Sequence, residues 1–133
     1  MERRLEIYNK IEENIKKYIR NYKESKCYTN NYEDDCLEEL WYVSENIVSS
    51  FEDQILSFKD ESKRLMFERY YELFLITSIF ISDKLLNDEQ YCTIDVIIDV
   101  VNKKYTEEII YKAETILLSH IKYTSILNYS NLL

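Results

Sequence analysis

The chain contains no glycine and no proline in its 133 residues. Glycine most readily takes the left-handed backbone that tight turns and phosphate-binding loops need. Tight hairpins and glycine-rich nucleotide loops therefore have no obvious residues to form them. Helices joined by polar loops remain, so we predict an all-α protein. A chain of this length fits a single domain, residues 1–133, that buries a core of its own.

Charge, cysteine and histidine content narrow the function. The 25 acidic residues outnumber the 17 lysines and arginines, and the net charge of −8 opposes binding to nucleic acid. Cys27, Cys36 and Cys92 lack Cys-x-x-Cys spacing and a histidine cluster, which predicts a reducing compartment with no metal and no cofactor. His120 is the only histidine, with no local nucleophile, so we predict no enzyme. The charged N-terminus lacks a signal-peptide core, which favours the cytosol.

Apolar spacing predicts helices in the first half of the chain. A first helix over residues 2–24 has its buried stripe at Tyr8, Ile11, Ile15, Tyr18 and Tyr22. Residues 25–34 read as a loop, and Asp34 or Asp35 caps the next helix. Helical spacing then continues to Phe58 with a bend near Ser49–Ser50, and residues 59–62 form a second break.

The second half begins with the most apolar segment, residues 65–86, which we predict to be a buried central helix. Charges interrupt this segment too soon for a membrane span. Thr93 caps a helix to Lys104, for which a strand is the alternative because β-branched residues are abundant. Thr106 opens the last helix, whose predicted inward positions are Ile109, Ile110, Ala113, Ile116, Leu117 and Ile121.

Residues 36–47 resemble a degenerate BH3 motif, the death-motif helix of the Bcl-2 family. The apolar positions are Cys36, Leu40, Val43 and Ile47, and Ser44 and Glu45 stand where that motif has its small residue and its aspartate. The same spacing is typical of many surface helices packed on a core.

The order of the predicted elements also resembles the Bcl-2 fold. Residues 51–58 and 75–94 are similar to segments of small poxviral Bcl-2-like apoptosis inhibitors, especially those of leporipox and capripox viruses. The resemblance covers about residues 36–121 in pattern, with few fixed residues. It implies a single-domain Bcl-2-like helical bundle around a hydrophobic central helix. The Asn-Trp-Gly-Arg signature of cellular relatives is absent, because the chain has no glycine.

This resemblance implies a viral inhibitor of apoptosis that holds the BH3 helices of host proteins such as Bak, Bax and Bim in a hydrophobic groove. The candidate groove residues are Val43, Ile47, Val48, Phe51 and Ile55 on one wall and Leu65, Tyr70 and Phe74 on the other. Arg69, with Arg64 as the alternative, would pair with the ligand's aspartate. The resemblance further implies a monomer or homodimer in the host cytoplasm, or at the outer mitochondrial membrane through a tail that this chain lacks. Some poxviral members of the fold instead inhibit innate immune signalling.

A second resemblance is to the cyclin box, particularly that of phosphate-pathway cyclins. It rests on Phe74 to Ser78 leading to Lys84, followed by Tyr105-Thr106 and Glu114. It implies a regulatory subunit whose Lys84 and Glu114 contact a cyclin-dependent kinase. The chain departs from the cyclin pattern at Ile79, Phe80, Ile81 and Asp83, where cyclins have small residues, and it lacks the Asp-Arg pair of the preceding cyclin helix.

Overall fold

The computed structural model describes residues 2–26, 32–57, 59–86 and 92–120. These residues form a small, single-domain helical bundle of six helices without a strand, which confirms the all-α prediction. The helices are α1 (Glu2–Lys26), α2 (Tyr32–Ser57), α3 (Glu61–Arg69), α4 (Tyr71–Leu86), α5 (Ile94–Val100) and α6 (Glu107–His120).

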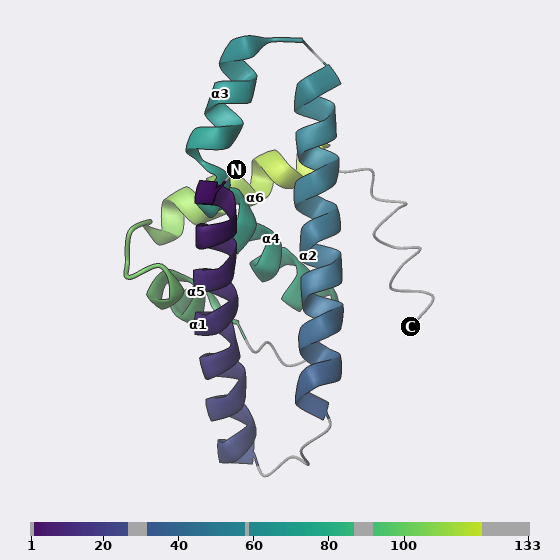
Figure 1. The fold of residues 1–133 in the computed structure, drawn as a ribbon. Helices are drawn as coiled ribbons and strands as arrows, with labels where there is room; N and C mark the ends of the chain where they lie inside the picture. The colour runs from purple at the N-terminus through teal and green to yellow at the C-terminus, as the bar shows by residue number, and fades with distance from the viewer. Residues whose placement is uncertain (1, 27–31, 58, 87–91, 121–133) are drawn as a thin grey trace.

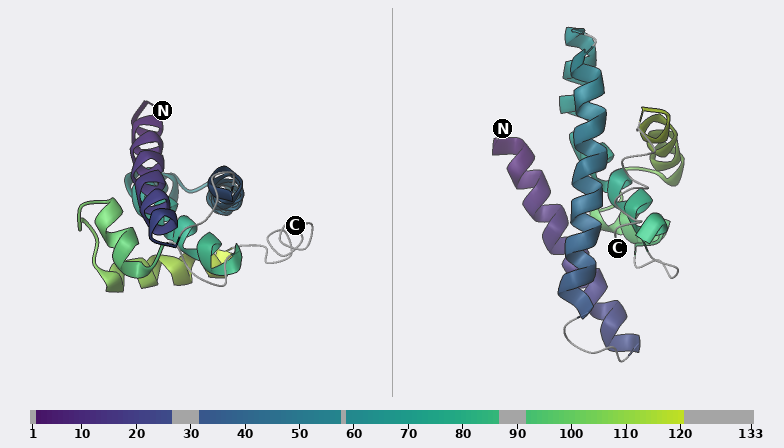
Figure 2. Two further views of the ribbon diagram at one scale, coloured as in Figure 1. Left: turned by 90° about the horizontal axis from the view of Figure 1, so that it is seen from below. Right: turned by 90° about the vertical axis from the view of Figure 1, so that its right-hand side faces the viewer.

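Helices α1 and α2 form an antiparallel pair on one side of α4, and α6 crosses α4 on the opposite side (Figures 1 and 2). Side chains confirm the antiparallel direction, because Arg4 reaches Glu52 while Tyr8 reaches Glu45. The short α5 packs on α1, and α3 packs on the end of α2. The long helices thus enclose the centre of the bundle.

Helix α4 is the centre of the bundle because it is apolar on nearly every side. All its residues from Leu73 to Asp83 are buried. It packs against each of the other five helices, most extensively against α2 and next against α6. A helix that is hydrophobic all round is stable only when neighbours cover every face, and the amphipathic stripes of α1, α2 and α6 provide that cover.

Small polar residues bring α2 close to α4. Ser44 of α2 and Ser78 and Ser82 of α4 are fully buried, and the hydroxyl oxygens of Ser44 and Ser82 lie 3.1 Å apart. Ser44 also donates to the carbonyl of Leu40 at 2.7 Å, and Ser82 donates to that of Ser78 at 2.7 Å. The buried hydroxyls are therefore hydrogen-bonded, which removes the usual cost of burying them.

Helix α2 is longer and more continuous than its sequence pattern indicates. It begins at Tyr32, ahead of Asp34 and Asp35, and it runs through Ser49–Ser50 without the predicted bend. Serine costs a helix interior well under about 1 kcal/mol. With no proline or glycine to interrupt the backbone hydrogen bonds, packing on α4 keeps the helix whole.

The predicted central helix over residues 65–86 is divided at Tyr70. Tyr70 leaves helical geometry (φ −107°, ψ 20°), so Leu65 belongs to α3 and not to α4. The Tyr70 amide donates to the Met66 carbonyl and the Phe74 amide donates to the Tyr70 carbonyl, both at 3.0 Å. These hydrogen bonds therefore give partners to backbone groups at the end of α3 and the start of α4. The sequence pattern does not indicate where this turn lies.

The segment after Thr93 is helical, as predicted, and not a strand, but α5 ends at Val100 and not at Lys104. Asn102 and Lys103 there take left-handed backbone angles (φ 54° and 61°). This conformation lets the Lys103 amide donate to the Ile98 carbonyl at 2.9 Å and close the helix end. In a chain without glycine, asparagine and lysine form this turn.

Helix α6 starts where the sequence predicts, just after Thr106, whose hydroxyl accepts from the Ile109 amide at 3.3 Å. Its inward face is narrower than predicted. Ile110, Ala113 and Leu117 are buried, whereas Ile109 and Ile116 are exposed. Ile121 lies outside the described residues.

Candidate functional site

The residues predicted to form a BH3 groove are divided between the core and the surface. Six of the nine are buried, each with no more than 6% of its surface exposed: Val43, Ile47, Val48, Phe51, Ile55 and Phe74. Leu65, Arg69 and Tyr70 are exposed. The guanidinium of Arg69 lies 5.6 Å from the centre of the Tyr70 ring. Arg69 therefore contacts the next residue in the sequence, Tyr70, at the end of α3.

Aromatic packing fills the space between the two predicted walls. The rings of Phe51 and Phe74 meet edge to face at 4.8 Å, and Phe67 stacks on Phe74 at 5.8 Å. Phe67 also contacts Tyr71 at 6.0 Å. These pairs add about 0.5–1.5 kcal/mol each beyond the apolar area they bury. A helix could enter between these walls only by separating these rings.

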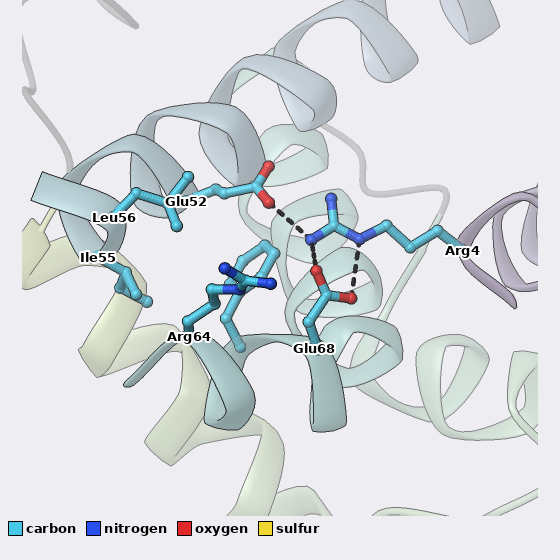
Figure 3. A pocket seen from close by; sticks show the side chains of 7 residues that line it. Arg4, Glu52, Ile55, Leu56, Arg64 and Glu68 are labelled. Atoms are coloured by element: carbon cyan, nitrogen blue, oxygen red, sulfur yellow. Dashed lines mark hydrogen bonds and ion pairs between the residues drawn. The ribbon is translucent and has the colours of Figure 1, made fainter. Parts of the chain in front are cut away.

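A pocket of about 450 Å³ does open next to this cluster, between α2 and α3 (Figure 3). It is lined by Arg4, Glu52, Ile55, Leu56, Arg64, Phe67 and Glu68. Of the predicted groove residues, this lining contains Ile55 and also Arg64, the alternative to Arg69 as the cation that pairs with a ligand. The lining contains two arginines and two glutamates, so its formal charges cancel. Its other three residues are apolar.

Arg4 holds three helices together at this pocket. Its guanidinium donates to Glu52 at 2.6 Å and, through Nε, to Glu68 at 3.1 Å, and it lies about 5 Å from the ring centres of Phe67 and Tyr71. The hydrogen bond to Glu52 raises the pKa of Arg4, and the hydrogen bond from Arg4 lowers the pKa of Glu68. Arg4 was not predicted as a functional residue, although it precedes Tyr8 and Ile11 on the buried stripe of α1.

A second candidate surface lies where the end of α4 meets α6. Lys84 Nζ forms an ion pair with the Glu114 carboxylate. The ammonium also lies 4.2 Å from the centre of the Phe80 ring, and Phe80 contacts the Tyr111 ring at 6.3 Å. We call this group of Phe80, Lys84, Tyr111 and Glu114 the α4–α6 face. It unites the two residues that the cyclin resemblance singles out.

Exposed apolar side chains lie close in sequence to members of the α4–α6 face. Tyr111 is 41% exposed, and Leu85 and Leu118 are similarly exposed. Leu85 follows Lys84 in the sequence, and Leu118 lies one turn beyond Glu114 on α6. A charge pair bordered by accessible apolar groups resembles the composition of protein interfaces, in which aromatic and apolar anchors lie next to orienting charges.

A metal site needs several acidic, cysteine or histidine side chains close together. Among the described residues, no three histidine, cysteine, aspartate or glutamate side chains gather where a metal ion could bind. The side chain of His120 lies outside what the structure describes. Asp83 is buried and accepts a hydrogen bond from the Cys92 amide at 2.9 Å, so it links the end of α4 to the residues that precede α5. None of the described helices is long and apolar enough to span a membrane.

Comparison with known proteins does not identify a family for this chain. No protein-family model matches it, and neither the curated proteins nor the solved structures include a significant match.

Proposed function

We propose that the chain is a cyclin-like regulatory subunit that binds a protein kinase through the α4–α6 face. The observation that carries this proposal is the meeting of Lys84 and Glu114 at an exposed surface, 30 residues apart in the sequence. The cyclin resemblance implies that this pair contacts the kinase. A lysine and a glutamate on a rigid pair of helices can break their own ion pair and form ion pairs with charged groups of a partner. These new ion pairs would orient the partner as it docks.

The packing of α4 supports the same proposal. The departures from the cyclin pattern were the large residues at positions 79–81 and Asp83. In the structure, Ser82 is the residue that meets Ser44 of α2, while Asp83 accepts a hydrogen bond from the Cys92 amide. A small residue, Ser82, thus lies at the close contact between the central helix and α2, two residues before Lys84. A central helix enclosed by all its neighbours also agrees with a cyclin-type bundle.

Charge reversal tests the proposal against a panel of purified cyclin-dependent kinases. We expect Lys84→Glu and Glu114→Lys each to weaken kinase binding at least about tenfold, equivalent to 1.4 kcal/mol. The double reversal restores the internal ion pair with opposite polarity, so it keeps the fold while presenting the wrong charges. Binding should remain weak in this double variant.

The matched control is the Glu12–Lys16 ion pair of α1, in which Oε1 and Nζ lie 3.2 Å apart and which contains no residue of the α4–α6 face. Its double reversal changes the same charges and should leave kinase binding unaltered. The proposal fails if no kinase binds the parent protein, or if the control reversal weakens binding as much as reversal at Lys84 and Glu114.

The competing proposal is a Bcl-2-like fold that captures BH3 helices. The observation that favours it is the pocket between α2 and α3, in which Ile55, Leu56 and Phe67 supply apolar surface and Arg64 supplies a cation. A BH3 helix carries apolar anchors and an aspartate, which match this lining. Titration with a panel of BH3 peptides tests the proposal, and Arg64→Glu should abolish binding. Absence of binding by every peptide would exclude it.

A further inference from the structure

Another pocket, of about 370 Å³, lies between α1 and α2 and has an aromatic and acidic lining. It is lined by Tyr8, Glu12, Lys16, Glu38, Trp41, Tyr42 and Glu45. It shares no residue with the α4–α6 face or with the pocket around Arg4. Neither proposed function uses this surface.

Aromatic rings give the pocket two surfaces that attract cations. The rings of Tyr8 and Trp41 contact each other at 4.8 Å with an interplanar angle of 41°. Tyr42, next to Trp41 in the sequence, is about half exposed. The faces of tryptophan and tyrosine rings attract ammonium and guanidinium groups, and the attraction grows when water is excluded.

The charges of the pocket leave room for an additional cation. Lys16 is its only basic residue, and its ammonium lies 3.2 Å from the Glu12 carboxylate. Glu45 accepts a hydrogen bond from the Tyr8 hydroxyl, and burial together with this bond raises the pKa of Tyr8. Tyr8 is therefore a neutral donor, and Glu45 contributes one carboxylate to the lining. Glu38 adds a second carboxylate, so the lining has an excess of negative charge.

The lining contains one buried side-chain donor, the indole N–H of Trp41. Trp41 is only 7% exposed, and its indole Nε1 has no hydrogen-bond partner among the described residues. A buried N–H without an acceptor is rare and costly. A backbone carbonyl beside a bound side chain would supply an acceptor once a shift of the ring exposes this N–H, whereas a free amine would not. This favours a peptide as the occupant.

We propose that this pocket binds the lysine or arginine side chain of a basic segment in a partner protein. The cation would lie against the rings of Trp41 and Tyr42, close to the carboxylates of Glu38 and Glu45. The overall charge of −8 attracts basic segments to the protein and raises the rate of their encounter.

Intrinsic fluorescence can test the proposal because Trp41 is the only tryptophan. The probes are short alanine peptides with a central lysine, arginine, glutamate or alanine, titrated into the full chain at low salt. We expect a saturable change in Trp41 emission with the lysine and arginine peptides, and none with the glutamate and alanine peptides. An equal response to all four would overturn the proposal.

Two sets of variants separate a specific pocket from general attraction. Glu38→Gln with Glu45→Gln should weaken binding of the lysine peptide at least about tenfold. Glu13→Gln with Asp53→Asn removes the same charge from exposed positions on the same two helices and should change binding less than about twofold. Equal losses in the two sets would show attraction by net charge alone. Circular dichroism of each variant checks that the fold is kept, and kinase binding is measured separately.

Discussion

Arg4 shows how one side chain can fix the relative positions of three helices. It lies on α1, yet its carboxylate partners are Glu52 of α2 and Glu68 of α3. The Arg4 side chain is 25% exposed, so water screens these ion pairs only partly. Its planar guanidinium also lies on the rings of Phe67 and Tyr71, a combination that lysine could not reproduce.

We therefore expect Arg4→Met to lower the free energy of unfolding by about 1–2 kcal/mol, since two carboxylates lose their shared partner. Urea denaturation followed by circular dichroism measures the loss. Arg3→Met is the matched control, because Arg3 is exposed on the same turn, and its effect should stay within about 0.5 kcal/mol. Equal effects at the two positions would contradict the role assigned to Arg4.

The same contact predicts a pH dependence. The hydrogen bond from Arg4 lowers the pKa of Glu68 below its value in the unfolded chain. The stabilisation is therefore complete above the ordinary glutamate pKa of about 4.3 and is lost as the pH falls through the lower, folded value. In Arg4→Met this part of the acid sensitivity should disappear, which parallel urea titrations at neutral and acidic pH would detect. If the difference in unfolding free energy between the parent and Arg4→Met is the same at every pH, the Arg4–Glu68 contact does not cause this acid sensitivity.

Phe51 tests whether the predicted groove wall is core. It is 1% exposed and contacts the rings of Phe67 and Phe74. We expect Phe51→Ala to cost about 3–5 kcal/mol of stability, because the cavity is lined by rings that cannot collapse into it. Thermal unfolding measures the cost, and Leu56→Ala on the exposed side of α2 is the control. A fully stable Phe51→Ala protein would mean that this cluster opens readily.

At the scale of whole elements, the turn after α5 shows the cost of folding without glycine. Lys103 has a left-handed backbone (φ 61°), which costs a residue with a Cβ atom about 1 kcal/mol or more. We expect Lys103→Gly to raise the free energy of unfolding by about 0.5–1 kcal/mol, while Lys103→Ala, which keeps the Cβ atom, gives no gain. The gain from Asn102→Gly should be smaller, because asparagine tolerates this conformation better. Denaturation midpoints of the three variants compare these effects.

The sequence predicts the elements better than their ends. The helical periodicity and the start of α6 at Thr106 were predicted correctly because apolar spacing and capping are local signals. The division at Tyr70 and the continuity of α2 depend on packing against α4, which no local signal reports. The burial of Val43, Ile47 and Phe51 has the same origin, because periodicity marks an apolar face without saying whether a helix of the chain or a partner covers it.

At the scale of the molecule, the sites differ in how far the sequence could reveal them. Lys84 and Glu114 were singled out by resemblance, and only the fold brings them together across α4 and α6. The aromatic and acidic pocket combines residues of α1 and α2 that have no shared motif. Its residues come together only because the two helices run antiparallel. Sequence periodicity does not predict which distant segments of the chain pair with each other.

The central place of α4 predicts a single cooperative core. Because α4 contacts every other helix and is buried from Leu73 to Asp83, its amides can exchange with solvent only when the whole bundle opens. Hydrogen exchange should therefore give residues 76–83 an opening free energy equal to that of global unfolding, and α5, which has only seven residues, a lower one. Arg4→Met should lower protection in α3 and at the start of α1 more than its loss of global stability alone explains. Exchange of the α4 amides through local opening, well below the global value, would contradict a bundle organised around this helix.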